Sequence, residues 1–190
     1  MLSKWRETIM NNKKVFRWWW SWESEKIEKW IEAQEGQGWH LVKVKSNLMR
    51  FQFVKGSPRT MRYVFDYQNN VDIDYKQLYE DAGWEQMYAK DNWYLWRKSY
   101  PADQPELRPE IYSDVDSIIQ RNNRIKKTLI TVGLVLIPIL IMNMVVQPMW
   151  QIRTSILVVY LLIFILFLYG VNRLATQNRR LQGKSKSLKN

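Results

Sequence analysis

Two uncharged apolar runs near the end of the chain, residues 128–152 and 154–171, constrain the fold more than any other feature of the sequence. Each run is long enough for a helix to cross a hydrocarbon core about 30 Å thick, which takes about 20 residues. Only Arg153 separates the two runs, and basic residues lie beyond both outer ends. Because a soluble core rarely buries two such runs in tandem, the sequence predicts a hairpin of two membrane-spanning helices.

The net charge of +11 comes entirely from the same part of the chain. The first 120 residues hold 18 basic and 18 acidic side chains and are therefore neutral, whereas the last 70 hold 11 basic side chains and no acidic one. Basic residues beside a span stay on the cytoplasmic side of a membrane, and the first 120 residues show no export signal. We therefore expect the chain to cross the membrane twice, with both termini in the cytoplasm.

Polar and aromatic side chains near the ends of the spans should hold the hairpin in the lipid bilayer. Aromatic rings favour the membrane interface, and basic side chains favour the anionic inner surface. The predicted anchoring residues are Trp150, Arg153, Tyr169 and Arg173. The side chains expected on the lipid surface are Arg179, Arg180, Lys184, Lys186 and Lys189. Asn143 and Gln147 in the first span would face the second helix or another copy of the chain, which leaves a homo-oligomer open.

The composition and spacing of polar residues argue against an enzyme. With no Cys and one His, the chain cannot form a disulfide, a cysteine nucleophile or the usual zinc sites. The glutamates of residues 23–35 alternate with Lys26 and Lys29 at helical spacing, a pattern typical of a solvated helix face. His40 has no evident orienting partner in the sequence, and the phosphate-loop and hydrolase motifs are absent. We expect no catalytic residue, no metal and no cofactor.

Nucleic-acid binding is not expected either. The region richest in aromatic residues is neutral overall, whereas phosphate binding favours a basic face. Lys43, Lys45 and Arg50 form only a small local basic patch. The basic C-terminal third is explained by a membrane surface without nucleic acid.

The region before the apolar runs contains a tandem repeat. Each copy reads strand, helix, strand, strand, and a Gly-Trp pair, Gly38-Trp39 or Gly83-Trp84, follows each helix. The first copy comprises residues 15–22, 24–37, 39–45 and 48–54, and the second comprises residues 61–67, 72–82, 85–89 and 93–97. The inward helix positions by spacing are Ile27, Trp30 and Ile31, then Tyr75, Leu78, Tyr79 and Ala82. This pattern predicts an α+β domain with a mainly antiparallel sheet and both helices on one face.

Composition divides the remaining chain into segments. A short extension, residues 1–14, precedes the aromatic-rich α+β domain, residues 15–100, and a proline-rich linker, residues 101–113, follows it. Ser113 is a candidate N-cap for a helix over 114–148 that continues from a juxtamembrane part into the first span. The remaining predicted segments are a turn at 149–153, a second span at 154–173 and a basic cytoplasmic tail at 174–190.

The most unusual segment of the domain is its first predicted strand. Alternation places Phe16, Trp18, Trp20 and Trp22 on one strand face, and Glu23 ends the strand. These rings either fill the core beneath the helices or line a pocket with Glu23, Asp66 or Glu85 at its rim. Such a pocket would suit a flat or cationic amphipathic ligand through stacking and cation–π attraction. The four rings and Glu23 are therefore the candidate ligand-binding residues.

Five stretches of the domain, residues 16–31, 38–44, 50–56, 63–67 and 79–85, together resemble one protein family. Its members are uncharacterised membrane proteins of Gram-positive bacteria, classed only as a domain of unknown function and commonly encoded beside PadR-type transcriptional regulators. The resemblance implies a bacterial cell membrane and a regulated envelope or stress response, and it supplies no catalytic residues. By topology alone, the doubled plan is also similar to the effector-binding domains of some multidrug-responsive regulators.

These observations lead to one expected function and two alternatives. We expect a non-enzymatic, membrane-anchored sensing or regulatory module whose cytoplasmic domain binds a small amphipathic ligand or a protein partner. The alternatives are a resistance or immunity-type protein that acts through its hairpin, and an enzyme on a lipid-derived substrate. The lipid bilayer is the partner common to all three.

Overall fold

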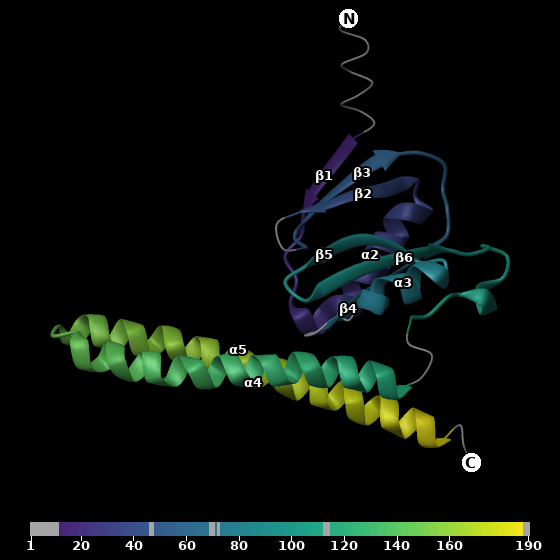
Figure 1. Cartoon of the computed structure of the whole chain (residues 1–190). Coiled ribbons are helices and arrows are strands. Elements are labelled where there is room, and N and C mark those ends of the chain that lie inside the picture. The colour runs from purple at the N-terminus through teal and green to yellow at the C-terminus, as the bar shows by residue number, and fades with distance from the viewer. Residues whose placement is uncertain (1–11, 46–47, 69–70, 72, 112–114, 188–190) are drawn as a thin grey trace, which may run out of the picture. The chain divides into compact units, whose positions relative to one another are not determined.

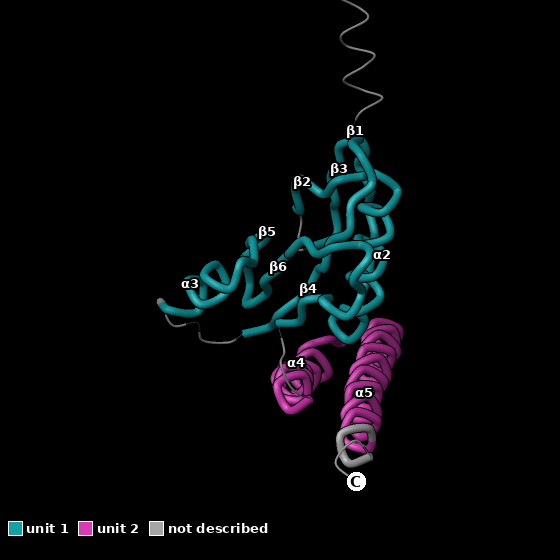
Figure 2. The backbone as a smooth tube through the Cα atoms, turned by 90° about the vertical axis from the view of Figure 1, so that its right-hand side faces the viewer, with its two compact units in different colours: residues 1–113 teal, residues 114–190 magenta. Residues whose placement is uncertain are grey.

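The computed structural model describes residues 12–45, 48–68, 71, 73–111 and 115–187, without the side chains of residues 73 and 184–187 (Figure 1). The chain divides into two compact units, Met1–Ser113 and Asp114–Asn190 (Figure 2). The predicted extension over residues 1–14 lies outside the described residues except for its last three, which begin the first strand. The candidate N-cap Ser113 also lies outside the described residues.

The first unit contains both copies of the predicted repeat, and each copy has the expected order of strand, helix, strand and strand. The elements of the first copy are β1 (Asn12–Phe16), the short 3₁₀ helix η1 (Ser21–Glu23), α2 (Ser24–Gly36), β2 (Trp39–Lys45) and β3 (Arg50–Lys55). Those of the second are β4 (Met61–Tyr67), α3 (Ile73–Asp81), β5 (Glu85–Lys90) and β6 (Trp93–Ser99), followed by the 3₁₀ helix η2 (Pro105–Leu107). The predicted α+β class is confirmed.

The six strands form two three-stranded antiparallel sheets, in the orders β1-β3-β2 and β4-β6-β5. In each sheet the last strand of the copy lies between the other two (Figure 1). Each sheet also has one register shift at the same relative place, beside Val42 in β2 and beside Met87 in β5. The antiparallel pairing follows the prediction, but each copy completes a sheet of its own.

The first strand is shorter than predicted, because β1 ends at Phe16 rather than at Trp22. The backbone N–H of Arg17 still donates to the Met49 carbonyl at 2.8 Å. Beyond it the Trp19 indole N–H donates to the Leu48 carbonyl at 2.7 Å, and η1 then begins at Ser21. The chain therefore leaves the sheet after Arg17.

The two helices contribute unequally to the core. In α2, Ile27 and Ile31 are buried, and the Trp30 ring packs edge-on against Phe51 and Phe53 of β3. In α3, Tyr75 and Tyr79 pack against a smaller cluster around Trp96. Leu78, which helical spacing placed inward, is 65% exposed, and Ala82 is exposed too. The nine-residue α3 is too short to turn all four predicted positions onto so small a cluster.

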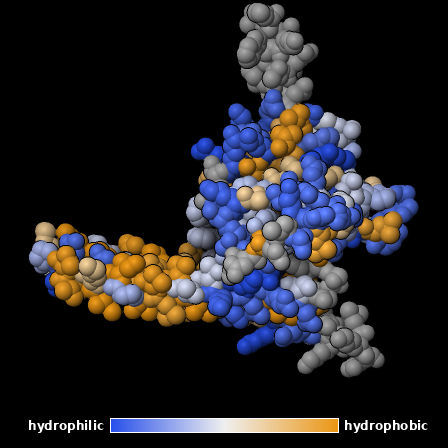
Figure 3. All heavy atoms as spheres, viewed as in Figure 1, coloured by the Kyte–Doolittle hydropathy of each residue, from blue (hydrophilic) through white to orange (hydrophobic). Residues whose placement is uncertain are grey.

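The second unit is the predicted hairpin of two long helices, α4 (Val115–Val146) and α5 (Trp150–Ser187). Both are long and apolar enough to span a membrane. Hydrophobic residues cover the part of the hairpin that ends at the α4–α5 turn, and hydrophilic residues cover the other end (Figure 3). In that hydrophilic part, the side chain of Asn178 hydrogen-bonds Asn122 and Asn123 at 2.9 and 3.1 Å. The helix of the second span is longer than predicted and continues through the basic tail to Ser187.

Candidate ligand-binding site

A hollow of about 290 Å³ opens on the first unit and is lined by both copies of the repeat. This volume lies near the lower end of the range for small-molecule sites. The lining residues are Trp19, Ser21 and Leu48 from the first copy, and Tyr67, Tyr88, Lys90, Asp91 and Trp93 from the second. Four of these eight residues, Trp19, Tyr67, Tyr88 and Trp93, are aromatic.

The aromatic wall of the hollow is held in place by ring contacts and one hydrogen bond. The Trp93 ring packs edge-on against Trp19 at 5.5 Å and lies 5.0 Å from Tyr67. Trp19 also packs on the buried Phe65 at 4.9 Å, and its N–H is held by the Leu48 carbonyl. Because the rings are fixed by one another and by the core, their faces are preorganised for stacking.

The polar rim of the hollow comes from the turn between β5 and β6. Asp91 and Asn92 have φ angles of 53° and 65°, as expected in a two-residue hairpin turn of type I′. The Asn92 carbonyl accepts a hydrogen bond from the backbone N–H of Gln68 at 2.9 Å, which ties the turn to the end of β4. Asp91 lies 3.6 Å from Lys90, and both side chains are exposed. Burial and the negative charge of Asp91 raise the pKa of Tyr88, so this phenol stays neutral at physiological pH.

The five predicted ligand-binding residues lie elsewhere, because none of them lines this hollow. Phe16 and Trp18 are 63% and 56% exposed, Trp22 is buried, and Glu23 forms an ion pair with Lys26 at 2.6 Å. Trp18, Trp20 and Trp22 contact one another in series, and the last two rings stack with 3° between their planes. The aromatic segment meets the hollow through its other face, at Trp19 and Ser21. The strand alternation that grouped Phe16, Trp18, Trp20 and Trp22 also places Trp19 on the opposite face. This alternation could therefore have identified Trp19 as a separate candidate.

The two other rim carboxylates proposed from the sequence also lie away from the hollow. Asp66 is fully buried and accepts hydrogen bonds from the side chains of Tyr75 and Gln68, each at 2.8 Å. Glu85 accepts two hydrogen bonds of 2.8 Å from Arg97. Both carboxylates stabilise neighbouring strands and helices, so Asp91 is the carboxylate that lines the hollow.

The predicted membrane-anchoring residues lie at the ends of the apolar part of the hairpin. Trp150 and Tyr169 are 69% and 53% exposed. The Arg173 guanidinium donates to the Tyr169 hydroxyl at 3.0 Å, and Arg153 donates to the Gln147 carbonyl. Of the predicted lipid-surface residues, Arg179 and Arg180 lie on α5. The side chains of Lys184 and Lys186, and the whole of Lys189, lie outside the described part of the chain.

Apart from the exposed Glu25, the glutamates of α2 do not form the solvated face that their spacing indicated. The Glu28 carboxylate accepts a hydrogen bond from the backbone N–H of Phe65 at 3.0 Å, and Glu32 accepts one from Tyr63 at 3.1 Å. These N–H groups lie on the edge of β4 that pairs with no strand in its sheet. Two glutamates one helical turn apart therefore cap alternate N–H groups of a strand edge.

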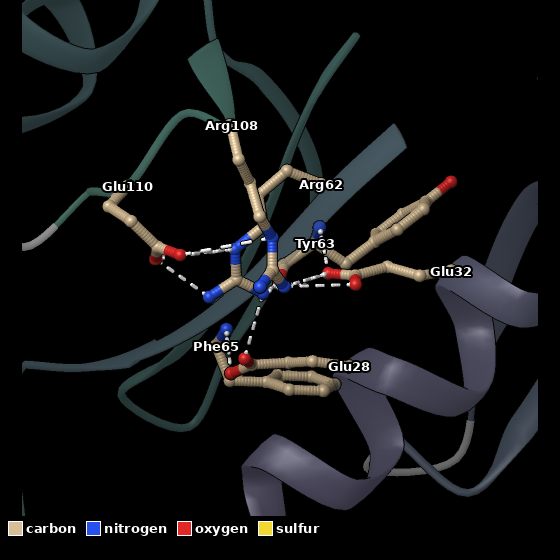
Figure 4. A network of polar contacts seen from close by, with 7 residues as sticks. All are labelled: Glu28, Glu32, Arg62, Tyr63, Phe65, Arg108 and Glu110. Atoms are coloured by element: carbon tan, nitrogen blue, oxygen red, sulfur yellow. Dashed lines mark hydrogen bonds and ion pairs between the residues drawn. The ribbon is translucent and has the colours of Figure 1, made fainter. Parts of the chain in front are cut away.

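Arginines neutralise the charge of these glutamates (Figure 4). The Arg62 guanidinium lies 3.1 Å from Glu28, 2.8 Å from Glu32 and 2.8 Å from Glu110. Arg108 forms a second ion pair with Glu32 at 3.0 Å. Because Arg108 and Glu110 belong to the proline-rich linker, this Arg62 network holds the linker, α2 and β4 together. Burial acts to lower the pKa of Arg62, but the facing carboxylates outweigh it and raise the pKa.

Glu35 at the end of α2 is fully buried and also fully hydrogen-bonded. It accepts hydrogen bonds from the Leu41 N–H at 2.8 Å, the Tyr63 hydroxyl at 2.6 Å and Arg59 at 2.7 Å. Burial acts to raise the pKa of Glu35, but these donors outweigh it and hold the pKa below its ordinary value. Such a carboxylate stays ionised and holds the fold, which makes it a poor proton donor or acceptor. Within the described residues, no group of three His, Asp or Glu side chains could hold a metal ion.

Comparison with known families agrees with the resemblance. The family described as a protein of unknown function, DUF2812, matches residues 23–134. The chain belongs to this family. The match covers the Arg62 network and most of the lining of the hollow, but it begins after Trp19. Comparisons with curated proteins and with solved structures gave no match.

Proposed function

We propose that this protein is a non-enzymatic sensing or regulatory module that the α4–α5 hairpin anchors in a bacterial cell membrane. The first unit binds a small amphipathic cation in the hollow between the two copies of the repeat. The observation that carries this proposal is the preorganised wall of Trp19, Tyr67 and Trp93 with the carboxylate of Asp91 at its rim. Aromatic faces attract a flat, positively charged molecule, and Asp91 adds a carboxylate that can exchange its exposed ion pair with Lys90 for the ligand cation.

The anchoring part of the proposal is supported by the exposure of large apolar side chains along the hairpin. Leu134 and Leu161 are 61% and 59% exposed, and Leu168 is 69% exposed. Exposed apolar surface on this scale is stable in hydrocarbon and unfavourable in water. The basic residues at both outer ends of the hairpin favour cytoplasmic termini.

The non-enzymatic part is supported by how the buried carboxylates are used. Glu28, Glu35 and Asp66 each accept hydrogen bonds that hold a strand or helix in place. None of the three lines the hollow. A general acid or base must instead reach the substrate.

The proposal is tested by calorimetric titration of the full-length protein in lipid nanodiscs. The probe is N-methylquinolinium, a flat aromatic cation, and quinoline at a pH where it is neutral serves as its uncharged counterpart. We expect saturable binding of the cation, and we expect Asp91→Asn to weaken it about tenfold because one charge contact is lost. Binding of the neutral ring should change little in that variant.

A matched pair of tryptophan substitutions locates the binding site. Trp93→Leu removes a ring from the hollow, whereas Trp18→Leu removes an exposed ring outside it. We expect only Trp93→Leu to abolish saturable binding, with the melting temperature of each variant measured as a control for folding. If Trp18→Leu abolishes binding while Asp91→Asn and Trp93→Leu retain it, the ligand site lies on the other face of the aromatic segment. Absence of saturable binding in the wild type would overturn the proposal.

A further inference from the structure

The sheet β1-β3-β2 has one face in the core and one face outside it. Phe51, Phe53 and Leu41 point inward, where the Trp30 ring of α2 covers the two phenylalanines. Because side chains alternate along a strand, the residues between them point outward. The strand register aligns Lys14, Gln52 and Lys43 in one row across the outer face, and Phe16, Arg50 and Lys45 in the next.

The outer face carries an unneutralised positive charge. Lys14, Lys43, Lys45 and Arg50 are all exposed, and the three strands contain no Asp or Glu. Within the described residues, none of these four cations belongs to an ion pair. We call them, with Phe16, the basic face.

The inward lysines of the same strands are used differently. Lys13 and Lys55 lie over the Trp39 ring at 5.3 and 4.9 Å and donate hydrogen bonds to Gln34 and Gln37. These two lysines therefore have protein partners, whereas the outward cations project into solvent. The outward cations are therefore available to an external partner.

Exposed aromatic rings accompany this charge. Phe16 ends β1 and is 63% exposed, and Trp18 follows it and is 56% exposed. Val42, at the register shift of β2, is 52% exposed. Basic side chains mixed with exposed aromatic rings are typical of surfaces that bind an anionic lipid interface, where the rings enter the headgroup region.

We propose that the basic face binds the surface of an anionic lipid bilayer, in the leaflet from which the hairpin enters. Charge complementarity supports this partner, and so does the short tether. Only residues 112–127 separate the last described residue of the first unit from the first apolar run, and residues 115–127 belong to α4, which is about 20 Å of helix. At the high effective concentration that such a tether produces, even individually weak contacts are occupied. This inference rests on the membrane anchoring proposed above, and it is independent of the ligand in the hollow.

Because the sequence contains no cysteine, a single introduced cysteine can be labelled at one defined position. A single cysteine replaces Gln52 in the middle of the basic face and carries an environment-sensitive fluorophore. The control cysteine replaces Glu25, an exposed residue of α2. The full-length protein is placed in nanodiscs of phosphatidylcholine alone or with phosphatidylglycerol. We expect a blue shift at position 52 only in the anionic discs, reversed by raised salt because salt screens exposed charges. Equal emission in both discs, or an equal shift at position 25, would overturn the proposal.

A charge-matched pair of triple variants isolates the face itself. Lys43→Gln, Lys45→Gln and Arg50→Gln together should abolish the shift that depends on phosphatidylglycerol. Lys26→Gln, Lys29→Gln and Lys76→Gln remove the same charge from α2 and α3 and should leave the shift intact. If both triple variants lose it equally, net charge rather than this face is responsible, and the proposal fails.

Single-stranded nucleic acid is the competing partner for a basic face with aromatic rings. A fluorescent oligothymidylate titrated onto the protein in phosphatidylcholine discs tests it. Saturable binding that requires Lys43, Lys45 and Arg50, with no lipid-dependent shift, would replace the bilayer by nucleic acid. Titration of the first triple variant with N-methylquinolinium separates the two proposals, because its hollow is unchanged and its binding should match the wild type.

Discussion

The helices α2 and α3 occupy equivalent positions in the two copies of the repeat, yet α2 is largely buried and α3 is mostly exposed. The difference follows from the strands that each helix contacts, because α2 packs against β2 and β4, whereas α3 packs against β5. All seven residues of β4 are buried, and α2 caps the edge of β4 through Glu28 and Glu32. The strand equivalent to β4 in the first copy, β1, has an alternating burial pattern instead. The same sequence pattern therefore produced a largely buried helix in the first copy, which together with β4 we call the scaffold, and a mostly exposed helix in the second copy.

The largest expected effect comes from Arg62, which the comparison makes the central residue of the scaffold. Arg62→Ala leaves the buried Glu28 without its cation, and such a loss costs about 3 to 5 kcal/mol. Urea unfolding of the full-length protein, followed by tryptophan fluorescence, measures it. The counterpart on α3 is Lys76→Ala, which removes an exposed ion pair with Glu80 and should cost about 0.5 kcal/mol or less. Equal costs would contradict the distinction between the two helices.

Apolar substitutions on the two helices should differ in the same direction. Ile31→Ala empties a fully buried position of α2 and should cost about 2 to 5 kcal/mol. Leu78→Ala removes a side chain that is 65% exposed on α3 and should change stability by about 0.5 kcal/mol or less. The unfolding midpoints of the two variants provide the measurement. A large cost at Leu78 would mean that its side chain is covered in the protein.

The third prediction concerns acid, because α2 carries a buried carboxylate whose pKa is lowered. The lowered pKa of Glu35 means that ionised Glu35 stabilises the folded state above its ordinary pKa of 4.5. This contribution is lost as the pH falls through the lowered pKa, since the unfolded state then binds the proton more tightly. Unfolding free energies measured from pH 7 downward should fall more steeply for the wild type than for Glu35→Gln. Parallel curves would show that Glu35 does not contribute.

The smallest effect is expected at the tryptophans that follow the two helices. Trp39 is partly exposed between Lys13 and Lys55, whereas the equivalent Trp84 lies in a buried cluster with Trp96. Lys55→Met keeps the stem of the side chain and removes both its cation over Trp39 and its exposed hydrogen bond to the Gln37 carbonyl, so it should cost about 0.5 to 1 kcal/mol. Thermal unfolding at low and high salt checks this value. The difference between wild type and variant should shrink at high salt if the interaction is electrostatic.

The features predicted from the sequence were those with a local signal. The apolar runs around Arg153 predicted the hairpin, and the Gly-Trp pairs with alternating strands predicted the repeat. The burial of Glu28 could not be predicted because it lies within a run of glutamates and lysines, residues 23–35, that is typical of a solvated helix. Its partner Arg62 lies 34 residues away along the chain, and only the fold brings the two together. The hollow was missed for a similar reason, since Trp19 meets Trp93 only when the two copies pack.

The Arg62 network also limits how the sequence can change over evolution. One guanidinium serves Glu28, Glu32 and Glu110, which come from a helix and from the linker. A substitution at position 62 removes the cation paired with Glu28 and one of the two cations paired with Glu32 and with Glu110, which Arg108 also neutralises, whereas a substitution at position 110 leaves the pairs of Arg62 with Glu28 and Glu32 intact. In related sequences we therefore expect coordinated substitutions at positions 28, 32 and 62, and more independent variation at position 110. Such covariation is expected wherever several carboxylates share one cation.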